Sequence, residues 1–468
     1  MSPDSKALTA QAQSSRAGSR LNQAVDRSRR AVAAAPSSAV AEHNLAAALG
    51  DAGRWAEAEV HVRNAFAKGG AAPETWLVLG RCHQALGALD DAEQAFLQAL
   101  QRRPTLYDAH LDLAQLRWMR TGESLVALAG IDRAILNSPA DPRLSHVKAK
   151  ILEGTGQIEE AYVLLKSLER SAAGDLAIAV YASQVASLVG DSSVAVTYAE
   201  RAIALAPQDS VAAIALIIAL LGAGDPARAE ALAIRLYAQA PSDQHTVALL
   251  ATTWRLLGDA RYGVLYDYDA LVKTSFLDVP AGWSSLAEYA DALRSALRRA
   301  HTMQTHPFNQ SVRHASQVAD ILDIKDPAIA ALPWALHRPI TQYIANLGGG
   351  EDPLRKRNLG GYAFQGMWSI RMKAGGYHVD HVHPNGWISS ACYIEAPDAG
   401  GGHEGWIRFG APGVPTAPLL GAERFIKPTP GMVVLFPSYM WHGVVPYTQA
   451  GARMSLAFDL EPVAGGDW

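Results

Sequence analysis

Residues 73–104 read PETWLVLGRCHQALGALDDAEQAFLQALQRRP, and residues 208–241 read QDSVAAIALIIALLGAGDPARAEALAIRLYAQAP. Both stretches place apolar and small residues at helical spacing on either side of a glycine, and both end on a proline. The glycine lets the chain turn between two antiparallel helices, and the proline stops the second helix. Each stretch therefore predicts a hairpin of two helices.

The same spacing of helix-ending glycines and prolines recurs along the first half of the chain. The glycines that break the helical pairs are Gly53, Gly87, Gly122, Gly156, Gly190, Gly224 and Gly258, with successive differences of 34, 35, 34, 34, 34 and 34 residues. The second helix of each pair is expected to end at a further proline or glycine: Pro36, Gly70, Pro104, Pro139, Gly174, Pro207 and Pro241. A helix pair cannot bury its apolar face alone, so stacked neighbours must supply the core. The pattern predicts a solenoid of helix pairs.

This period resembles that of the tetratricopeptide repeat (TPR) family. The resemblance covers residues 37–273, and residues 1–36 are expected to form a polar segment and a first helix. It implies a concave groove that binds a peptide or an extended protein segment. The alternative is that the array is only a spacer or an oligomerisation surface.

Composition narrows the range of partners and compartments. Lys plus Arg is 41 and Asp plus Glu is 45, so the formal charge is 41 − 45 = −4, which gives no reason to expect nucleic acid or an anionic membrane. The most apolar uncharged run, Ser210–Gly224, has 15 residues, whereas a membrane span needs roughly 20. The only two cysteines, Cys82 and Cys392, lie far apart and fit a reducing compartment. We therefore expect a soluble cytoplasmic protein.

Residues 274–350 lose the 34-residue period and are expected to form a helical connecting segment. One helix should follow the Pro280–Gly282 turn, and another should form within DPAIAALPWALHRPITQYIANL (326–347). Between them, HPFNQSVRHASQ (306–317) is expected to be a surface loop.

From residue 351 the pattern changes to short stretches rich in aromatic and β-branched residues, separated by Gly and Pro turns. The strand-like stretches are 366–372, 387–396, 406–410, 432–437 and 453–460. Many short strands with turn signals predict a sandwich or a barrel-like roll over residues 351–468. Five of the 15 histidines lie between His378 and His442, which marks this region as the one that carries chemistry.

Candidate metal ligands are concentrated in YHVDHVHPNGWISSACYIEAP (377–397). Residues i and i+2 of an extended strand face the same side. His381 and His383 therefore form one candidate ligand pair, and His378 and Asp380 form a second pair on the opposite face. A third candidate, His442, lies 442 − 383 = 59 residues further along the chain.

A set of three ligands on one side of Fe(II) leaves positions open for a co-substrate and O₂. 2-Oxoglutarate would chelate the metal with one carboxylate and its keto oxygen, and its other carboxylate needs a fixed cation and a hydroxyl. Arg453 and Ser455 share one face of a later strand, 453 − 442 = 11 residues past His442. Arginine supplies a planar bidentate fork that lysine cannot match.

These residues resemble the 2-oxoglutarate/Fe(II)-dependent oxygenase superfamily, and within it a bacterial and phage branch with H-x-H-P before a strand and G-x-x-x-x-F-P-S…H near the end. The matching motifs are His381-Val-His383-Pro384 and Gly431-MVVL-Phe436-Pro437-Ser438…His442, and the resemblance covers residues 368–460. It implies a double-stranded β-helix, a cupin-like jelly roll, with flanking helices. It also implies Fe(II) on His381, His383 and His442, with the distal carboxylate of 2-oxoglutarate on Arg453 and Ser455.

One departure leaves the first ligand pair open. Most of the superfamily uses His-x-Asp/Glu, and His378-Val-Asp380 offers that alternative. We favour His381 and His383, because the H-x-H-P motif lies closer to the following strand. We expect Arg371 to form a surface ion pair.

The resemblance implies an O₂-dependent oxygenase, by default a hydroxylase, whose substrate could be a peptide or protein held by the repeats. The alternative is a TPR scaffold whose cupin-like metal-binding domain has no turnover. Because all candidate ligands lie after Tyr377, a fragment that begins near Asp267 is expected to keep the site.

Overall fold

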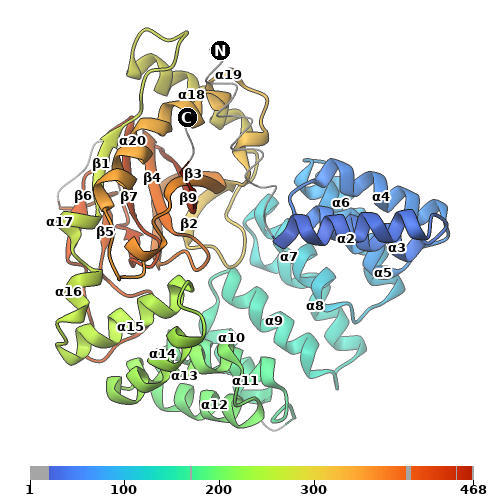
Figure 1. Ribbon diagram of the computed structural model, residues 1–468. Coiled ribbons are helices and arrows are strands. Elements are labelled where there is room, and N and C mark those ends of the chain that lie inside the picture. The colour runs from blue at the N-terminus through green and yellow to red at the C-terminus, as the bar shows by residue number, and fades with distance from the viewer. Residues whose placement is uncertain (1–19, 169–170, 397–401, 449–450, 466–468) are drawn as a thin grey trace. The chain divides into compact units, whose positions relative to one another are not determined.

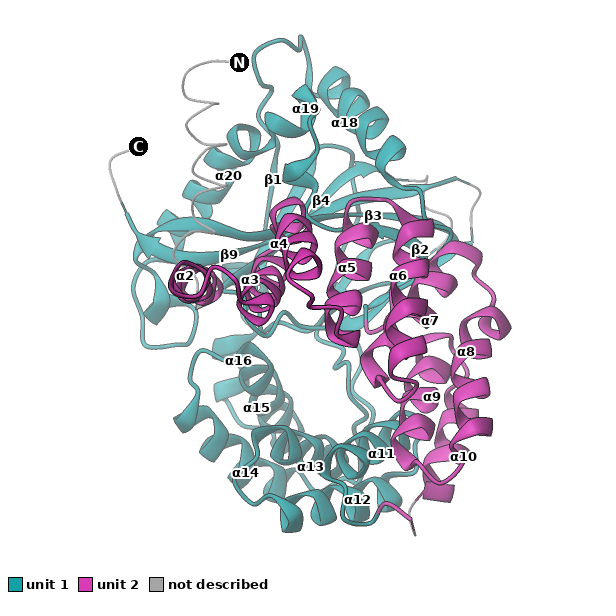
Figure 2. Cartoon of the chain, turned by 90° about the vertical axis from the view of Figure 1, so that its right-hand side faces the viewer, with its two compact units in different colours: residues 1–13, 173–306, 310–468 teal, residues 14–172, 307–309 magenta. Residues whose placement is uncertain are grey.

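The computed structural model describes residues 20–168, 171–396, 402–448 and 451–465 (Figure 1). The chain forms two compact units (Figure 2). One comprises residues 14–172 and 307–309, and the other comprises residues 1–13, 173–306 and 310–468. We call them the N-terminal unit and the C-terminal unit and describe each by itself.

The N-terminal unit consists of antiparallel helix pairs. Its helices are α2 (Arg20–Ala34), α3 (Ala39–Asp51), α4 (Trp55–Ala67), α5 (Pro73–Ala85), α6 (Leu89–Arg102), α7 (Tyr107–Thr121), α8 (Ser124–Asn137), α9 (Pro142–Gly154) and α10 (Ile158–Leu168). Close packing within a pair explains one glycine: a Cβ on Gly80 of α5 would lie 2.4 Å from the Phe96 ring of α6. These helices confirm the predicted solenoid.

The repeats continue into the C-terminal unit. Its repeat helices are α11 (Leu176–Leu188), α12 (Ser192–Leu205), α13 (Ser210–Gly222), α14 (Pro226–Gln239), α15 (Gln244–Leu257) and α16 (Arg261–Leu265). All seven glycines that were expected to break a helix pair, from Gly53 to Gly258, have φ between 68° and 88°. Only glycine adopts this left-handed region without strain, so the sequence pattern has a direct conformational cause.

Aspartate side chains begin most helices of the later repeats. Asp175, Asp191, Asp209, Asp225 and Asp243 each accept a hydrogen bond from a backbone N–H in the first turn of the following helix. Such caps satisfy otherwise unpaired donors and typically stabilise a helix by about 1 kcal/mol. Among the described residues, no helix is long and apolar enough to cross a membrane.

An antiparallel sheet follows the repeats in the C-terminal unit. Its strands are β1 (Lys273–Phe276), β2 (Val312–Val318), β3 (Gly360–His381), β4 (Ile388–Glu395), β5 (Ile407–Phe409), β6 (Arg424–Ile426), β7 (Met432–Pro437), β8 (His442–Val444) and β9 (Arg453–Ala464). The order is β1-β7-β4-β9-β3-β8-β5-β6, with β2 paired to β3. This arrangement is consistent with a jelly roll and confirms the predicted fold class.

Two long and two short helices connect the repeats to the sheet and cover it. They are α17 (Tyr268–Leu271), α18 (Leu286–Ala300), α19 (Pro327–Ala330) and α20 (Leu332–Leu347). α20 packs against β1, β3 and β7, and α18 packs against β4. The helices expected after the Pro280–Gly282 turn and within residues 326–347 are thus present.

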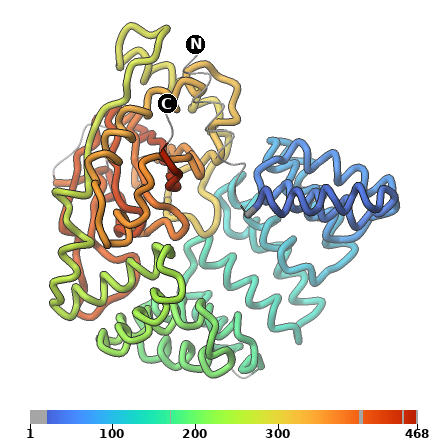
Figure 3. Tube along the Cα trace, viewed as in Figure 1, coloured from blue at the N-terminus to red at the C-terminus, as the bar shows by residue number. Residues whose placement is uncertain are grey.

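Two strands were missed in and next to the segment for which we expected helices joined by a surface loop. β1 pairs with β7, and β2 pairs with β3. The expectation of a surface loop over residues 306–317 is therefore wrong for residues 312–317. Both strands obtain their hydrogen-bond partners from remote parts of the chain, and such pairing overrides weak local preference. Figure 3 traces the chain from α16 through β1 toward the rest of the sheet.

The last repeat is built into the same compact unit as the sheet. Arg255 at the end of α15 donates to the carbonyls of Gly410 and Gly421, at 2.8 and 3.0 Å. Tyr439 after β7 donates to the carbonyl of Leu265 at 3.1 Å. In addition, Gln244 and residues 246–253 of α15 are buried. A boundary near residue 273 would cut through this core.

We therefore expect a fragment of residues 267–468 not to fold, whereas residues 173–468 should fold. The shorter fragment exposes the apolar surface that α15 covers and leaves the carbonyls of Gly410 and Gly421 without their Arg255 donor, a combination that costs several kcal/mol. This replaces the expectation that a fragment from Asp267 keeps the site. Circular dichroism and thermal unfolding of both fragments test it. Cooperative unfolding of the shorter fragment at the temperature of the longer one would contradict it.

Candidate active site

The end of β3 carries a β-bulge that decides which side chains face inward. His378 pairs with Val444 of β8, and His381 pairs with His442, so three residues of β3 span two of β8. An extra residue in one strand shifts the alternation of its side chains by one. The bulge therefore lies within the motif that was expected to alternate regularly.

His378 and His381 consequently lie together. Their rings stack with centroids 5.6 Å apart, and both lie within hydrogen-bond distance of the Ser311 hydroxyl, at 2.9 Å and 3.2 Å. Asp380 is directed elsewhere and forms a bidentate ion pair with Arg408, at 2.9 and 2.5 Å. The expectation that His378 and Asp380 form a pair on one face is wrong, because the bulge separates them.

His381, His383 and His442 form a compact cluster. Their ligating atoms all lie within 4.8 Å of one another, and the Nε2 atoms of His381 and His383 are 3.3 Å apart. His381 lies at the end of β3, His383 follows it, and His442 begins β8 directly opposite. The fold thus brings together residues that are 59 positions apart in the sequence, 442 − 383.

Each Nδ1 atom of this cluster has a partner outside it. His381 lies 2.9 Å from the carbonyl of Val379, and His442 lies 3.0 Å from that of Met440. His383 lies 2.6 Å from the Asp459 carboxylate. Such partners fix the tautomer and leave Nε2 free to bind a metal. Three imidazoles whose ligating nitrogens lie within 4.8 Å of one another fit a first-row divalent ion such as Fe(II).

Burial favours the neutral form of His381, of His442 and of the neighbouring His378. Burial, reinforced by the charge of His383, lowers the pKa of His381 to about 3. Burial also lowers the pKa values of His378 and His442 well below the usual value, and the charge of His381 adds to this effect. The neutral imidazole is the form that binds a metal, so near neutral pH these rings need not lose a proton first.

A buried cation lies on the same inner face. Arg453, Ser455 and Asp459 are separated along β9 by even numbers of residues, so their side chains point to one side of the sheet. Asp459 is the partner of His383. Arg453 is 1% exposed, and its Nη1 lies 3.3 Å from the Ser455 hydroxyl. No carboxylate among the described residues lies within ion-pair distance of it. Because an unpaired buried charge is costly, this arrangement fits an anionic ligand.

Tyr393 of β4 lies beside Arg453 and was missed in the sequence. The Arg453 guanidinium lies 5.1 Å from the centre of its ring. Its hydroxyl is buried and makes no hydrogen bond within the described part of the chain. Burial raises the pKa of Tyr393 to about 12, so the hydroxyl remains protonated and can donate to an anion. Tyr393 can be recognised as a neighbour of this site only because it pairs with Ser455 of β9, and that pairing exists only in the folded sheet.

The side chains of His403 and Trp387 do not belong to the cluster. His403 stacks on Phe425 with centroids 4.1 Å apart. Trp387 is fully buried and donates to the carbonyl of Leu354 at 2.9 Å. Both side chains pack within the domain and do not contribute to the cluster.

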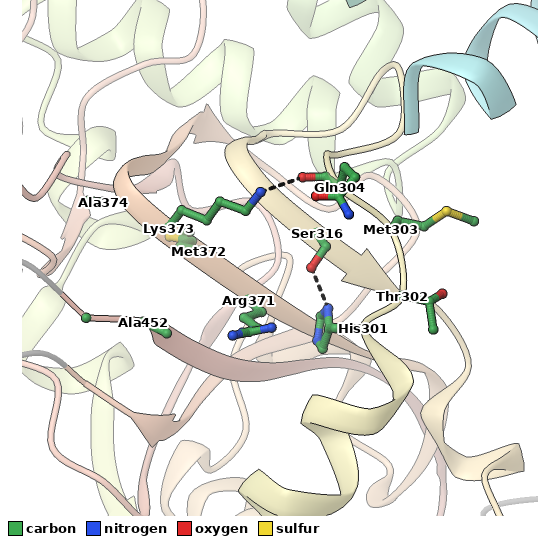
Figure 4. Close-up of a pocket in the computed structure, with 11 residues that line it drawn as sticks. His301, Thr302, Met303, Gln304, Ser316, Arg371, Met372, Lys373, Ala374 and Ala452 are labelled. Carbon is green, nitrogen blue, oxygen red and sulfur yellow. Dashed lines mark hydrogen bonds between the residues drawn. The ribbon is translucent and has the colours of Figure 1, made fainter. Parts of the chain in front are cut away.

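Arg371 lies on the opposite face of β3 from the cluster. It lines a cavity of about 480 Å³ together with His301, Ser316 and Lys373 (Figure 4). The expected surface ion pair of Arg371 is absent among the described residues. His301 lies between Ser316 and Ser369, with a ring nitrogen 2.8 Å from the first hydroxyl and 3.0 Å from the second.

Comparisons with known proteins match two separate parts of the chain to two families. Residues 366–459 match the family described as "Putative 2OG-Fe(II) oxygenase", and residues 51–105 match the tetratricopeptide repeat family. The first match spans the three clustered histidines together with Arg453 and Ser455. None of the curated proteins matches the chain.

Among solved structures, three similar chains illustrate the range. A tetratricopeptide repeat protein from Parabacteroides merdae is 15% identical, with a TM-score of 0.36, over 54% of this chain and 99% of its own. The Thermus thermophilus TPR protein TTC0263 is 24% identical, with a TM-score of 0.30, over 40% and 99%.

The third is a chain of the APC/C hetero-tetramer Cut9-Hcn1, which is 14% identical, with a TM-score of 0.35, over 52% of this chain and 48% of its own. Our chain thus spans about half the length of that relative. In this chain, a region that matches tetratricopeptide repeats is therefore followed by a region that matches the family described as "Putative 2OG-Fe(II) oxygenase".

Proposed function

We propose that the protein is a 2-oxoglutarate- and Fe(II)-dependent dioxygenase. The observation that carries the proposal is that two unlike features occur on one inner face of the sheet. One is the cluster of His381, His383 and His442, and the other is the buried Arg453 without a counter-ion. A metal site alone would need no such cation, and an anion site alone would need no such cluster.

When bound, Fe(II) and 2-oxoglutarate supply the oxidising chemistry: O₂, 2-oxoglutarate and a substrate C–H bond give a hydroxylated substrate, succinate and CO₂. His381, His383 and His442 hold the metal through Nε2. Asp459 orients His383 by accepting from its Nδ1. This contact also compensates in part for the absence of a carboxylate ligand, because a partner carboxylate makes an imidazole a better donor.

Arg453 holds the distal carboxylate of the co-substrate. The Ser455 hydroxyl lies 3.3 Å from its Nη1, and the ring centre of Tyr393 lies 5.1 Å from its guanidinium carbon. A guanidinium can bind a carboxylate through two parallel N–H donors. Because Arg453 is almost fully buried, a carboxylate there is shielded from water and the ion pair is strengthened. These residues thereby set the length and charge of the co-substrate that the site accepts.

The substrate class that we favour is a peptide or protein segment, with hydroxylation as the outcome. The support for it is the array of helix pairs in the same chain, since TPR arrays commonly bind extended segments. A small-molecule substrate would give the repeats no such role.

The proposal predicts stoichiometric binding of one Fe(II) and one 2-oxoglutarate under anaerobic conditions, followed by release of succinate when O₂ is admitted. Metal analysis, calorimetry and succinate quantification measure these three quantities on the full chain. Oxalate in place of 2-oxoglutarate serves as a control, because it can chelate iron but cannot reach Arg453.

The alternative function is a TPR scaffold with a metal-binding domain that lacks turnover. It predicts metal binding without succinate release, even when peptides are supplied. Absence of both metal and 2-oxoglutarate binding would contradict the proposal and the alternative together.

A further inference from the structure

Helix α15 of the last repeat lies against the segments that carry two candidate metal ligands. The backbone N–H of Gln244, at its start, donates to the carbonyl of Pro384 at 3.0 Å. Further along, the Thr252 hydroxyl accepts from the indole N–H of Trp441 at 2.9 Å. Pro384 directly follows His383, and Trp441 directly precedes His442. One helix thus contacts the chain beside each of two ligands.

The Thr252 hydroxyl uses both of its hydrogen-bonding functions. It donates to the carbonyl of Ala248 at 2.8 Å, one turn earlier in α15, and accepts from Trp441. Thr252 is 2% exposed and Trp441 is 4% exposed, so water is largely excluded from this contact. A buried indole N–H requires an acceptor, and Thr252 is the partner that the fold provides.

The backbone around Trp441 is held from the same side. Its N–H donates to the hydroxyl of Tyr266, which follows α16, at 3.0 Å. The Tyr266 hydroxyl in turn donates to the carbonyl of Tyr439 at 3.2 Å. Residues on both sides of Met440 are therefore fixed by the end of the repeat array. The carbonyl of Met440 is the one that lies 3.0 Å from Nδ1 of His442.

We infer that Thr252 is a positioning residue for His442 and that α15 is part of the scaffold of the metal centre. Thr252 fixes the Trp441 indole, the fixed Tyr439–Trp441 segment sets the direction of the Met440 carbonyl, and that carbonyl sets the orientation of the His442 imidazole. The inference rests on the proposed function in that it takes His442 as a metal ligand. It assigns to the repeat array a role in the metal site itself, in addition to recruitment.

The adjacent Thr253 provides a matched control. Its hydroxyl donates to the carbonyl of Leu249 at 2.8 Å, and Thr253 is fully buried, as Thr252 nearly is. Thr252→Val and Thr253→Val each replace a hydroxyl by a methyl of similar size and each remove one intrahelical hydrogen bond. Only Thr252→Val also removes the acceptor of Trp441. The two variants therefore differ in the contact under test.

The test measures the affinity of the full-length apoprotein for Co(II) by calorimetry, the visible spectrum of the Co(II) form, and the melting temperature. Removing a partner of a metal ligand typically lowers metal affinity about 10–100-fold, and Thr252 acts one contact further away. We expect about a tenfold loss and an altered spectrum for Thr252→Val. Thr253→Val should keep wild-type affinity despite a similar fall in melting temperature, and Thr252→Ser should restore both metal readouts.

Equal affinities of Thr252→Val and Thr253→Val would overturn the inference, as would a loss that Thr252→Ser fails to restore. Failure of the wild-type protein to bind Co(II) or Fe(II) would instead refute the proposed function, so the two failures are distinguishable. If Thr252→Val does not fold, Thr252→Ala removes the same acceptor without introducing a branched apolar side chain, and the same outcomes apply to it.

Discussion

Replacing His383 by alanine is expected to abolish iron binding and succinate production, whereas Asp380→Asn should leave both close to the wild-type values. His383 contributes one of three imidazole nitrogens that lie within 4.8 Å of one another. Asp380 is instead engaged with Arg408, at 2.9 and 2.5 Å. Loss of one of only three protein ligands removes most of the affinity, because the remaining two imidazoles cannot hold Fe(II) against water.

We expect Asp380→Asn to lower the free energy of unfolding of the protein. Asparagine keeps the shape of the side chain but loses its charge, so Arg408 loses a charge-assisted pair. Since the Arg408 side chain is 29% exposed, water compensates in part, and we expect a loss of about 1–2 kcal/mol in the free energy of unfolding. His403→Ala serves as a control for removing an imidazole from this domain, because the His403 ring stacks on Phe425.

The measurement is iron content after anaerobic loading and desalting, together with 2-oxoglutarate-dependent succinate release. If Asp380→Asn loses its iron while His383→Ala keeps it, the ligand pair is His378 and Asp380. Retention of iron by both variants would contradict a metal site at this end of β3.

Replacing Arg453 by lysine is expected to weaken 2-oxoglutarate binding about 10–100-fold while Fe(II) binding changes little. Lysine keeps the charge but cannot form the bidentate contact, and the loss of a charge-assisted pair costs about 1.5–3 kcal/mol. Burial makes the effect larger than it would be at the surface, because Arg453 is 1% exposed and water cannot substitute for it. The iron ligands do not contact Arg453, so metal affinity should be preserved.

Anaerobic titration of 2-oxoglutarate into the Fe(II)-loaded variant measures this loss. Arg371→Lys is the matched control. Arg371 of β3 pairs with Met454 of β9, the residue next to Arg453. Its side chain therefore lies on the other face of the sheet from that of Arg453. An unchanged affinity in Arg453→Lys would mean that Arg453 has a structural role and that another cation holds the co-substrate.

The candidate site was predictable from the sequence only in part. Three of its histidines, together with Arg453 and Ser455, could be named because their spacing matches a recognised pattern. The inward position of His378 could not be predicted, because the bulge in β3 appears only when β3 is aligned with β8. Tyr393 gave no signal either, since a tyrosine in a buried strand is ordinarily core packing.

The sequence by itself determined the repeat architecture. Its 34-residue period, the left-handed glycines such as Gly87 and the aspartate caps such as Asp209 all act within a few residues of the chain. Local conformational preferences and helical periodicity are therefore sufficient to specify the helix pairs, and stacking of neighbours follows from their unburied apolar faces.

Only the tertiary structure decided how the metal centre is supported. Asp459 reaches His383 across 76 positions, and Thr252 reaches Trp441 across 189. Neither partner carries a local signal, because a hydroxyl or carboxylate acquires its role only when a remote donor is brought next to it. Contacts between distant segments form as the sheet closes and α15 packs against it, and no periodicity in the sequence encodes them.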